Sequence, residues 1–217
     1  MPYSATIENL QKALAEQLPG RAAQELMTGR VLPMPDQVPD DARPSGVLLL
    51  LFPKEQALHL LFIRRTEDGR AHSGQISFPG GKQEPTDADL RATALREAQE
   101  EAGIISGEVS MLGALTPLYI PISNFMVYPF VGYSGSMPEY NISEHEVAEI
   151  IELPVEWLFE EARKIITTLR PSSRPDMQLS VPAYQLADGS YIWGATAMIL
   201  SELEVVWKKL DGLLSTG

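Results

Sequence analysis

The chain of 217 residues is long enough for one domain of ordinary size with an appendage, and a second full domain is not expected. Its formal net charge of −12 argues against binding duplex DNA or anionic membranes, because both kinds of binding depend on dense lysine and arginine. Cysteine is absent, which excludes disulfides, thiolate zinc sites and cysteine nucleophiles.

The N-terminus lacks the basic start and apolar core of a secretory signal. The longest apolar run, VLLLLF at Val47–Phe52, is far shorter than the roughly 20 residues that span a bilayer. We therefore expect a cytoplasmic protein with a small-molecule partner and with no nucleic-acid or membrane partner.

The first part of the chain is predicted to be an appendage. Residues Thr6–Leu18 carry apolar side chains at helical spacing, which predicts an amphipathic helix. Four prolines stand among acidic residues in Val31–Pro44, a composition that breaks regular structure and indicates a strap along the surface. We assign residues 1–44 to this helix and proline-rich strap, 45–210 to the main domain and 211–217 to a C-terminal tail.

The main domain opens with short apolar runs and then a helix. The predicted elements are strands at Val47–Phe52 and Ala57–Arg64, a short strand ending in a loop at Gly74–Gly81, and a helix at Asp87–Ala102. Thr86 or Asp87 can cap this helix, and Gly103 can end it.

The second half of the domain alternates strand and helix signals. The predicted elements are strands at Met111–Tyr119 and Met126–Tyr133, a strand at Val147–Leu153, a helix at Val155–Ile166, a hairpin of Ala183–Leu186 with Tyr191–Gly194, and a helix at Ala195–Leu210. Pro117, Pro121 and Pro129 are expected to confine the first two of these strands to edges or bulges.

Three carboxylates of the helix at Asp87–Ala102 share one arc. At about 100° per residue from Arg96, Glu100 lies at about 40°, Glu97 at about 100° and Glu101 at about 140°. A solvated acidic face is one interpretation. Within a cleft, however, two such charges about 5 Å apart repel by roughly 3 kcal/mol, which favours a neutralising cation. Carboxylate oxygens suit Mg²⁺ or Mn²⁺, so a divalent-metal site is the sharper hypothesis.

The wider stretch FPGGKQEPTDADLRATALREAQEEAGI resembles the signature of the Nudix hydrolases. Its helical half runs from Arg96 to Ile104 and matches well. Its front half departs, because fourteen residues separate Gly81 from Arg96, one more than in the general pattern. The signature's first glutamate has no clean counterpart, since Asp87 and Ala88 occupy the candidate positions. The resemblance implies an α/β/α sandwich with a mixed β-sheet, here with an N-terminal helical extension.

The extra residue is expected of the coenzyme A pyrophosphatase branch of the Nudix family. The preceding segment also resembles that branch, whose additional motif is matched by Leu61, Arg65, Arg70, Gly74, Gln75 and the FPGG ending, while Phe62 and Ile63 depart from it. The resemblance implies metal-dependent hydrolysis of the diphosphate of coenzyme A or acyl-CoA. The products would be 3′,5′-ADP and 4′-phosphopantetheine or its acyl derivative.

Roles for individual residues follow from this resemblance. Glu97, Glu100 and Glu101 are the expected metal ligands, and Arg96 is expected to fix a neighbouring carboxylate. Of three acidic residues in a later loop, Glu144, Glu146 and Glu149, we choose Glu146 as the general base. The expected substrate-binding residues are Arg65, Arg70, Gly74 and Gln75, together with Gly80 and Gly81, which would let the loop approach the helix.

Two other functions are open at this point. One is a Nudix diphosphatase for ADP-ribose, dinucleotides or nucleoside triphosphates, and the other is a non-catalytic Nudix module that binds a nucleotide. Degenerate modules commonly lose the helix glutamates, and all three are present in this chain. A homodimer formed through the N-terminal helix or the strap is compatible with the sequence.

Overall fold

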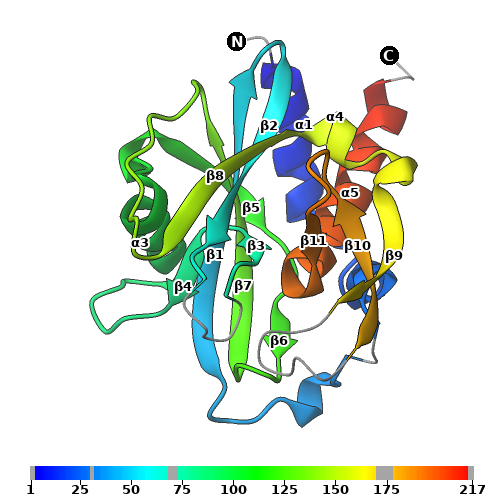
Figure 1. The fold of residues 1–217 in the computed structure, drawn as a ribbon. Coiled ribbons are helices and arrows are strands. Elements are labelled where there is room, and N and C mark those ends of the chain that lie inside the picture. The colour runs from blue at the N-terminus through cyan, green and yellow to red at the C-terminus, as the bar shows by residue number, and fades with distance from the viewer. Residues whose placement is uncertain (1–2, 30–31, 68–72, 170–177, 215–217) are drawn as a thin grey trace.

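A mixed β-sheet between two helical layers is the centre of the fold (Figure 1). The computed structural model describes residues 3–29, 32–67, 73–169 and 178–214. The strands of the main sheet are β1 Arg43–Lys54, β2 Ala57–Arg65, β3 Ile76–Ser77, β4 Gly80–Lys82, β5 Val109–Ala114, β6 Leu118–Ile120, β7 Phe125–Ser134 and β8 Val147–Pro154. A second sheet contains β9 Lys164–Leu169, β10 Leu179–Gln185 and β11 Tyr191–Trp193.

The main sheet is ordered β3-β2-β1-β7-β5, with β4 beside β1, β6 beside β7 and β8 beside β2. The pairing of β1 with β7 is parallel and that of β1 with β2 is antiparallel, so the sheet is mixed as predicted. The helices are α1 Ser4–Ala15, α2 Arg21–Gln24, α3 Leu90–Ala102, α4 Val155–Leu158 and α5 Gly194–Leu214, with 3₁₀ turns at Glu25–Met27, Pro35–Gln37, Ser106–Glu108 and Glu161–Arg163.

Alternation along β1 builds a core on each face of the sheet. Leu48 and Leu50 belong to a buried cluster that contains the alanines of α3, whereas Leu49 and Leu51 belong to a larger cluster that contains α1 and α5. Because successive side chains of a strand point to opposite faces, an uninterrupted apolar run is what a strand covered on both faces requires. The predicted α/β/α sandwich is confirmed.

The N-terminal segment is packed onto the C-terminal helix. The apolar side of α1 is buried in the larger cluster. The fully buried carboxylate of Glu202 on α5 accepts hydrogen bonds from Gly20 N at 3.0 Å and Gln24 Nε2 at 3.0 Å. It also accepts one from Thr116 Oγ1 at 2.6 Å. One buried acid therefore ties the N-terminal segment and the loop before β6 to α5.

The prediction that Thr86 or Asp87 caps the N-terminus of the acidic helix is wrong. The helix begins at Leu90, and Asp89 caps it, with its side chain accepting a hydrogen bond from Ala92 N at 2.8 Å. Asp87 is not available as a cap because its carboxylate binds Arg96. The predicted end at Gly103 is confirmed by a left-handed conformation with φ 78°, which glycine adopts without strain.

The predicted helix at Val155–Ile166 is also wrong beyond its first turn. Only α4 is helical, and after a short 3₁₀ turn the chain continues as β9, which pairs with β10. The β-branched run Ile165–Thr168 favours a strand, and pairing with β10 decides the outcome. The predicted hairpin of β10 and β11 is confirmed.

The predicted strand Met111–Tyr119 is split into β5 and β6, with Pro117 in the break. Pro129 lies in β7, which is internal to the sheet rather than at its edge. Its carbonyl oxygen accepts a hydrogen bond from Leu115 N at 2.9 Å, so the side of β7 that lacks a Pro129 N–H faces this break. The sheet thus accommodates the proline by interrupting the neighbouring strand.

At the C-terminal end, α5 runs to Leu214, so residues 211–214 of the predicted tail are helical. Over the described residues, no helix has both the length and the apolar character needed to cross a membrane.

Candidate active site

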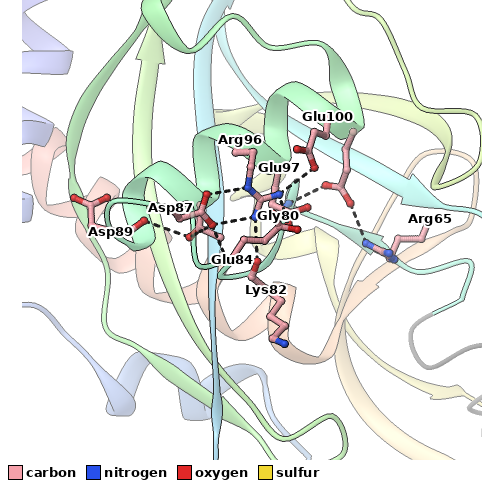
Figure 2. A network of polar contacts seen from close by, with 11 residues as sticks. Arg65, Gly80, Lys82, Glu84, Asp87, Asp89, Arg96, Glu97 and Glu100 are labelled. Atoms are coloured by element: carbon pink, nitrogen blue, oxygen red, sulfur yellow. Dashed lines mark hydrogen bonds and ion pairs between the residues drawn. The ribbon is translucent and has the colours of Figure 1, made fainter.

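The acidic side of α3 lies against the turn that forms β4 (Figure 2). A Cβ atom added to Gly81 would lie 2.4 Å from the carboxyl carbon of Glu97, so Glu97 occupies the space that a side chain at position 81 would need. Gly80 N donates a hydrogen bond to Glu101 Oε2 at 2.8 Å. Gly80 and Gly81 therefore allow the backbone of the turn to contact two of the three predicted metal ligands, Glu101 and Glu97.

Glu101 is nearly buried, with 2 % of its side chain exposed. Arg65 Nη1 lies 3.1 Å from its Oε1. Burial raises the pKa of Glu101 to about 7, opposed by the Gly80 N–H and the charge of Arg65 and supported by the nearby charges of Glu97 and Glu146. Burial likewise raises the pKa of Glu97.

Arg96 is the centre of a second set of contacts (Figure 2). Its Nη1 lies 3.0 Å from Glu97 Oε1 and 3.0 Å from Glu100 Oε2. Its Nε and Nη2 donate to the two oxygens of Asp87 at 2.9 and 3.1 Å, and Nη2 also donates to the carbonyl of Lys82 at 3.1 Å. Arg96 therefore contacts two of the three predicted ligand carboxylates, Glu97 and Glu100.

Asp87 is the residue that sequence reasoning placed wrongly. Hydrogen bonds from Arg96 lower its pKa to about 2, and it also accepts a bond from Thr93 Oγ1 at 2.9 Å. The available signal was its position, since Asp87 and Ala88 occupy the candidate positions for the signature's first glutamate. In the structure the Asp87 carboxylate holds the Arg96 guanidinium through both of its oxygens.

The donor chemistry suits a divalent ion, although the side chains are not grouped as a ready metal cage. Among the described residues, no three histidine, aspartate or glutamate side chains are close enough to hold a metal ion between them. Glu97 and Glu100 instead share Arg96 Nη1. Oxygen ligands of this kind suit Mg²⁺ or Mn²⁺, and the contacts with Arg96 engage one oxygen of each carboxylate, Glu97 Oε1 and Glu100 Oε2.

Among the three candidate bases, Glu146 carries a charge that raises the pKa values of Glu97, which is half-buried, and of Glu101, which is buried. Its own side chain is exposed. Its backbone is fixed, because Glu146 N donates to Ser143 O at 2.9 Å and its carbonyl accepts from Thr66 N at 3.0 Å. Glu149 is instead paired with Arg64 at 2.9 Å, and Glu144 is exposed.

Three of the predicted substrate-binding residues, Arg65, Gly74 and Gln75, lie at the end of β2 and in the segment between β2 and β3. Arg65 contacts Glu101, and its backbone N donates to Gln75 O at 3.0 Å. Gly74 adopts a left-handed conformation with φ 70°, and its N donates to Thr66 O at 3.3 Å. Arg70 lies outside the described residues.

A glycine-containing turn that pairs with a mixed β-sheet and contacts the acidic face of a helix is the arrangement of the Nudix class of proteins. Residues 42–172, more than half of the chain, match the family described as the NUDIX domain, so the chain belongs to the Nudix family. Family membership supports hydrolysis of a nucleotide-diphosphate substrate. Nudix hydrolases generally use divalent ions such as Mg²⁺ or Mn²⁺.

Several relatives carry the same family name. "Uncharacterized Nudix hydrolase NudL" of Pectobacterium atrosepticum is 39% identical over 145 residues, which cover 66% of this chain and 72% of that protein. The protein of the same name from Yersinia enterocolitica is 34% identical over 171 residues, covering 79% and 85%. The solved structure of a C. elegans Ap4A hydrolase binary complex covers 80% of this chain and 99% of that one, at 14% identity and a TM-score of 0.48.

The Gly81→Ala substitution tests the contact between the turn and α3. Because the new methyl group would occupy the position of the Glu97 carboxylate, we expect Mn²⁺ affinity and turnover to fall by about tenfold or more. Gly107→Ala is the matched control, since a Cβ there would meet nothing within 4 Å. Calorimetric Mn²⁺ titration of both variants measures the effect, and normal affinity in Gly81→Ala would contradict it.

Replacing Glu101 with glutamine is expected to stabilise the metal-free protein at alkaline pH. Its folded-state pKa of about 7 lies above the ordinary value of 4.5, so the penalty for ionising it is absent below about pH 4.5 and complete above about pH 7. We expect the free energy of unfolding to rise by about 1–3 kcal/mol at about pH 8, with a smaller gain near pH 5. Urea unfolding at both pH values measures this difference.

Glu100→Gln is the control for that experiment, because the Glu100 side chain is 55% exposed and carries little burial penalty. A gain for Glu101→Gln that is equal at both pH values, or that is matched by Glu100→Gln, would show that burial of the Glu101 charge is not its cause.

Proposed function

We propose that this Nudix hydrolase cleaves the diphosphate of coenzyme A or acyl-CoA with the aid of Mg²⁺ or Mn²⁺. Water is added across the phosphoanhydride, giving 3′,5′-ADP and 4′-phosphopantetheine or its acyl derivative. The observation that supports this choice is the contact between the additional motif and the acidic helix. Arg65, a residue of that motif, pairs with Glu101 at 3.1 Å.

The proposed chemistry divides between a bound ion and the residues that arrange it. Glu97, Glu100 and Glu101 would hold the divalent ion, which would neutralise charge at the diphosphate. Glu146 accepts a proton from the attacking water, since its exposed carboxylate lies close enough for its charge to raise the pKa values of Glu97 and Glu101. Arg96 is held by Asp87 and restrains the rotamers of Glu97 and Glu100.

The remaining parts of the proposal concern assembly and location. The apolar residues Ile7, Leu10 and Leu14 of α1 are buried in the chain's own core, so a homodimer through this helix would have to use its exposed side. We propose a cytoplasmic site of action, where coenzyme A and its acyl esters are used.

Product analysis tests the substrate. With Mg²⁺ or Mn²⁺ present, we expect the kcat/KM for coenzyme A to exceed that for ADP-ribose, a dinucleotide and a nucleoside triphosphate by roughly tenfold. Chromatography should show 3′,5′-ADP and 4′-phosphopantetheine. A comparable preference for one of the other substrates would assign the enzyme to another Nudix activity, and binding of coenzyme A without products would indicate a nucleotide-binding module.

Glu146→Gln tests the general base. The substitution keeps the shape of the side chain but removes its proton acceptor, so we expect kcat to fall by about 100-fold and the limb of the pH–rate profile that reports the base to disappear. Glu144→Gln, two residues away and also exposed, is the control. An unchanged rate and pH profile in Glu146→Gln would exclude it as the base.

A further inference from the structure

Strand β2 ends in two consecutive arginines that serve opposite faces of the sheet. Arg65 reaches Glu101 on α3 at 3.1 Å. Arg64 reaches Glu149 of β8 at 2.9 Å and Asp188 of the β10–β11 hairpin at 3.3 Å. Adjacent residues of a strand point to opposite faces, so only one of the two arginines can contact the acidic helix.

An irregularity in the neighbouring strand matches this division. Arg64 pairs with Glu149 and Arg65 pairs with Val147, so β8 carries one extra residue between these two pairs. The bulge changes the alternation of β8, because Val147 packs into the core beside α3 while Glu149 meets Arg64. As a result, Arg65 contacts α3, whereas Arg64 contacts β8 and the β10–β11 hairpin.

The surroundings of Glu101 leave it dependent on Arg65. The side chain is 2 % exposed, and within the described part of the chain each carboxylate oxygen has one donor, Arg65 Nη1 for Oε1 and Gly80 N for Oε2. Removing the guanidinium would leave a nearly buried carboxylate with a single backbone donor, a costly arrangement that rotation of the side chain would relieve.

The backbone of Arg65 is also fixed independently of any ligand. Its N–H donates to Gln75 O at 3.0 Å, and the next residue, Thr66, donates from its N to Glu146 O at 3.0 Å. A side chain on such a support can restrain a neighbour at little further cost in conformational entropy. The Arg65 side chain is 35% exposed, so most of its surface is already covered by contacts within the protein.

Building on the proposed function, we propose that Arg65 is a positioning residue that holds Glu101 in the orientation needed to bind the divalent ion. This differs from the role expected from the sequence, in which Arg65 binds a phosphate group of coenzyme A. The two roles separate experimentally, because a positioning residue affects metal binding before any nucleotide is present.

The test is a titration with Mn²⁺ alone, followed by electron paramagnetic resonance or calorimetry. We expect Arg65→Gln to weaken Mn²⁺ binding by about tenfold or more and Arg65→Lys to recover part of the loss. Arg64→Gln is the matched control on the same strand, and it should bind Mn²⁺ as the unmodified protein does. Circular dichroism establishes that each variant is folded, and Arg65→Lys carries the test if Arg65→Gln does not fold.

A second measurement compares coenzyme A with 3′-dephospho-coenzyme A. A positioning role lowers kcat/KM for both substrates by the same factor. Normal Mn²⁺ affinity in the Arg65 variants, combined with a rise in KM for coenzyme A alone, would overturn the proposal and make Arg65 a 3′-phosphate contact. The Mn²⁺ titration contains no nucleotide, so its result stands whether or not coenzyme A is the substrate.

Discussion

The close contact between the β4 turn and α3 is the constraint on which the acidic site depends. Glu97 fills the space beside Gly81, and Glu101 accepts the N–H of Gly80. The turn is itself held in place by antiparallel pairing with β1, the strand on which α3 packs. Because helix and turn share this support, the spacing between backbone and carboxylates is set by the sheet rather than by flexible side chains.

Two arginines balance part of the negative charge of the carboxylates at the site. Arg65 is paired with Glu101, and Arg96 is shared among Asp87, Glu97 and Glu100. Neither guanidinium is a freely available anion site, and the chain as a whole has a formal net charge of −12. An anionic diphosphate approaching these carboxylates would meet strong repulsion, which a divalent ion offsets.

The resemblance to the Nudix signature predicted the sandwich, and the burial of the apolar run in β1 and of the alanine side of α3 agrees with it. The sequence did not predict β9, where pairing with the next strand, β10, outweighs a helical pattern. The acidic cluster was likewise visible in the helical spacing, whereas the partners of Asp87 and Arg65 were not. Asp87 is equally suited to a cap or an ion pair, and which of two adjacent arginines faces α3 depends on register and on a bulge in another strand.

The packing of α1 against α5 joins the two ends of the chain in a single core. The apolar side of α1 is synthesised before α5 and cannot pack against it until residues 194–214 follow. Contacts of such large sequence separation form late and slow folding, since the intervening chain must be ordered before they are made. One half of the core therefore closes only after α5 has been synthesised, and α1 is a segment that a nascent chain must keep from associating elsewhere.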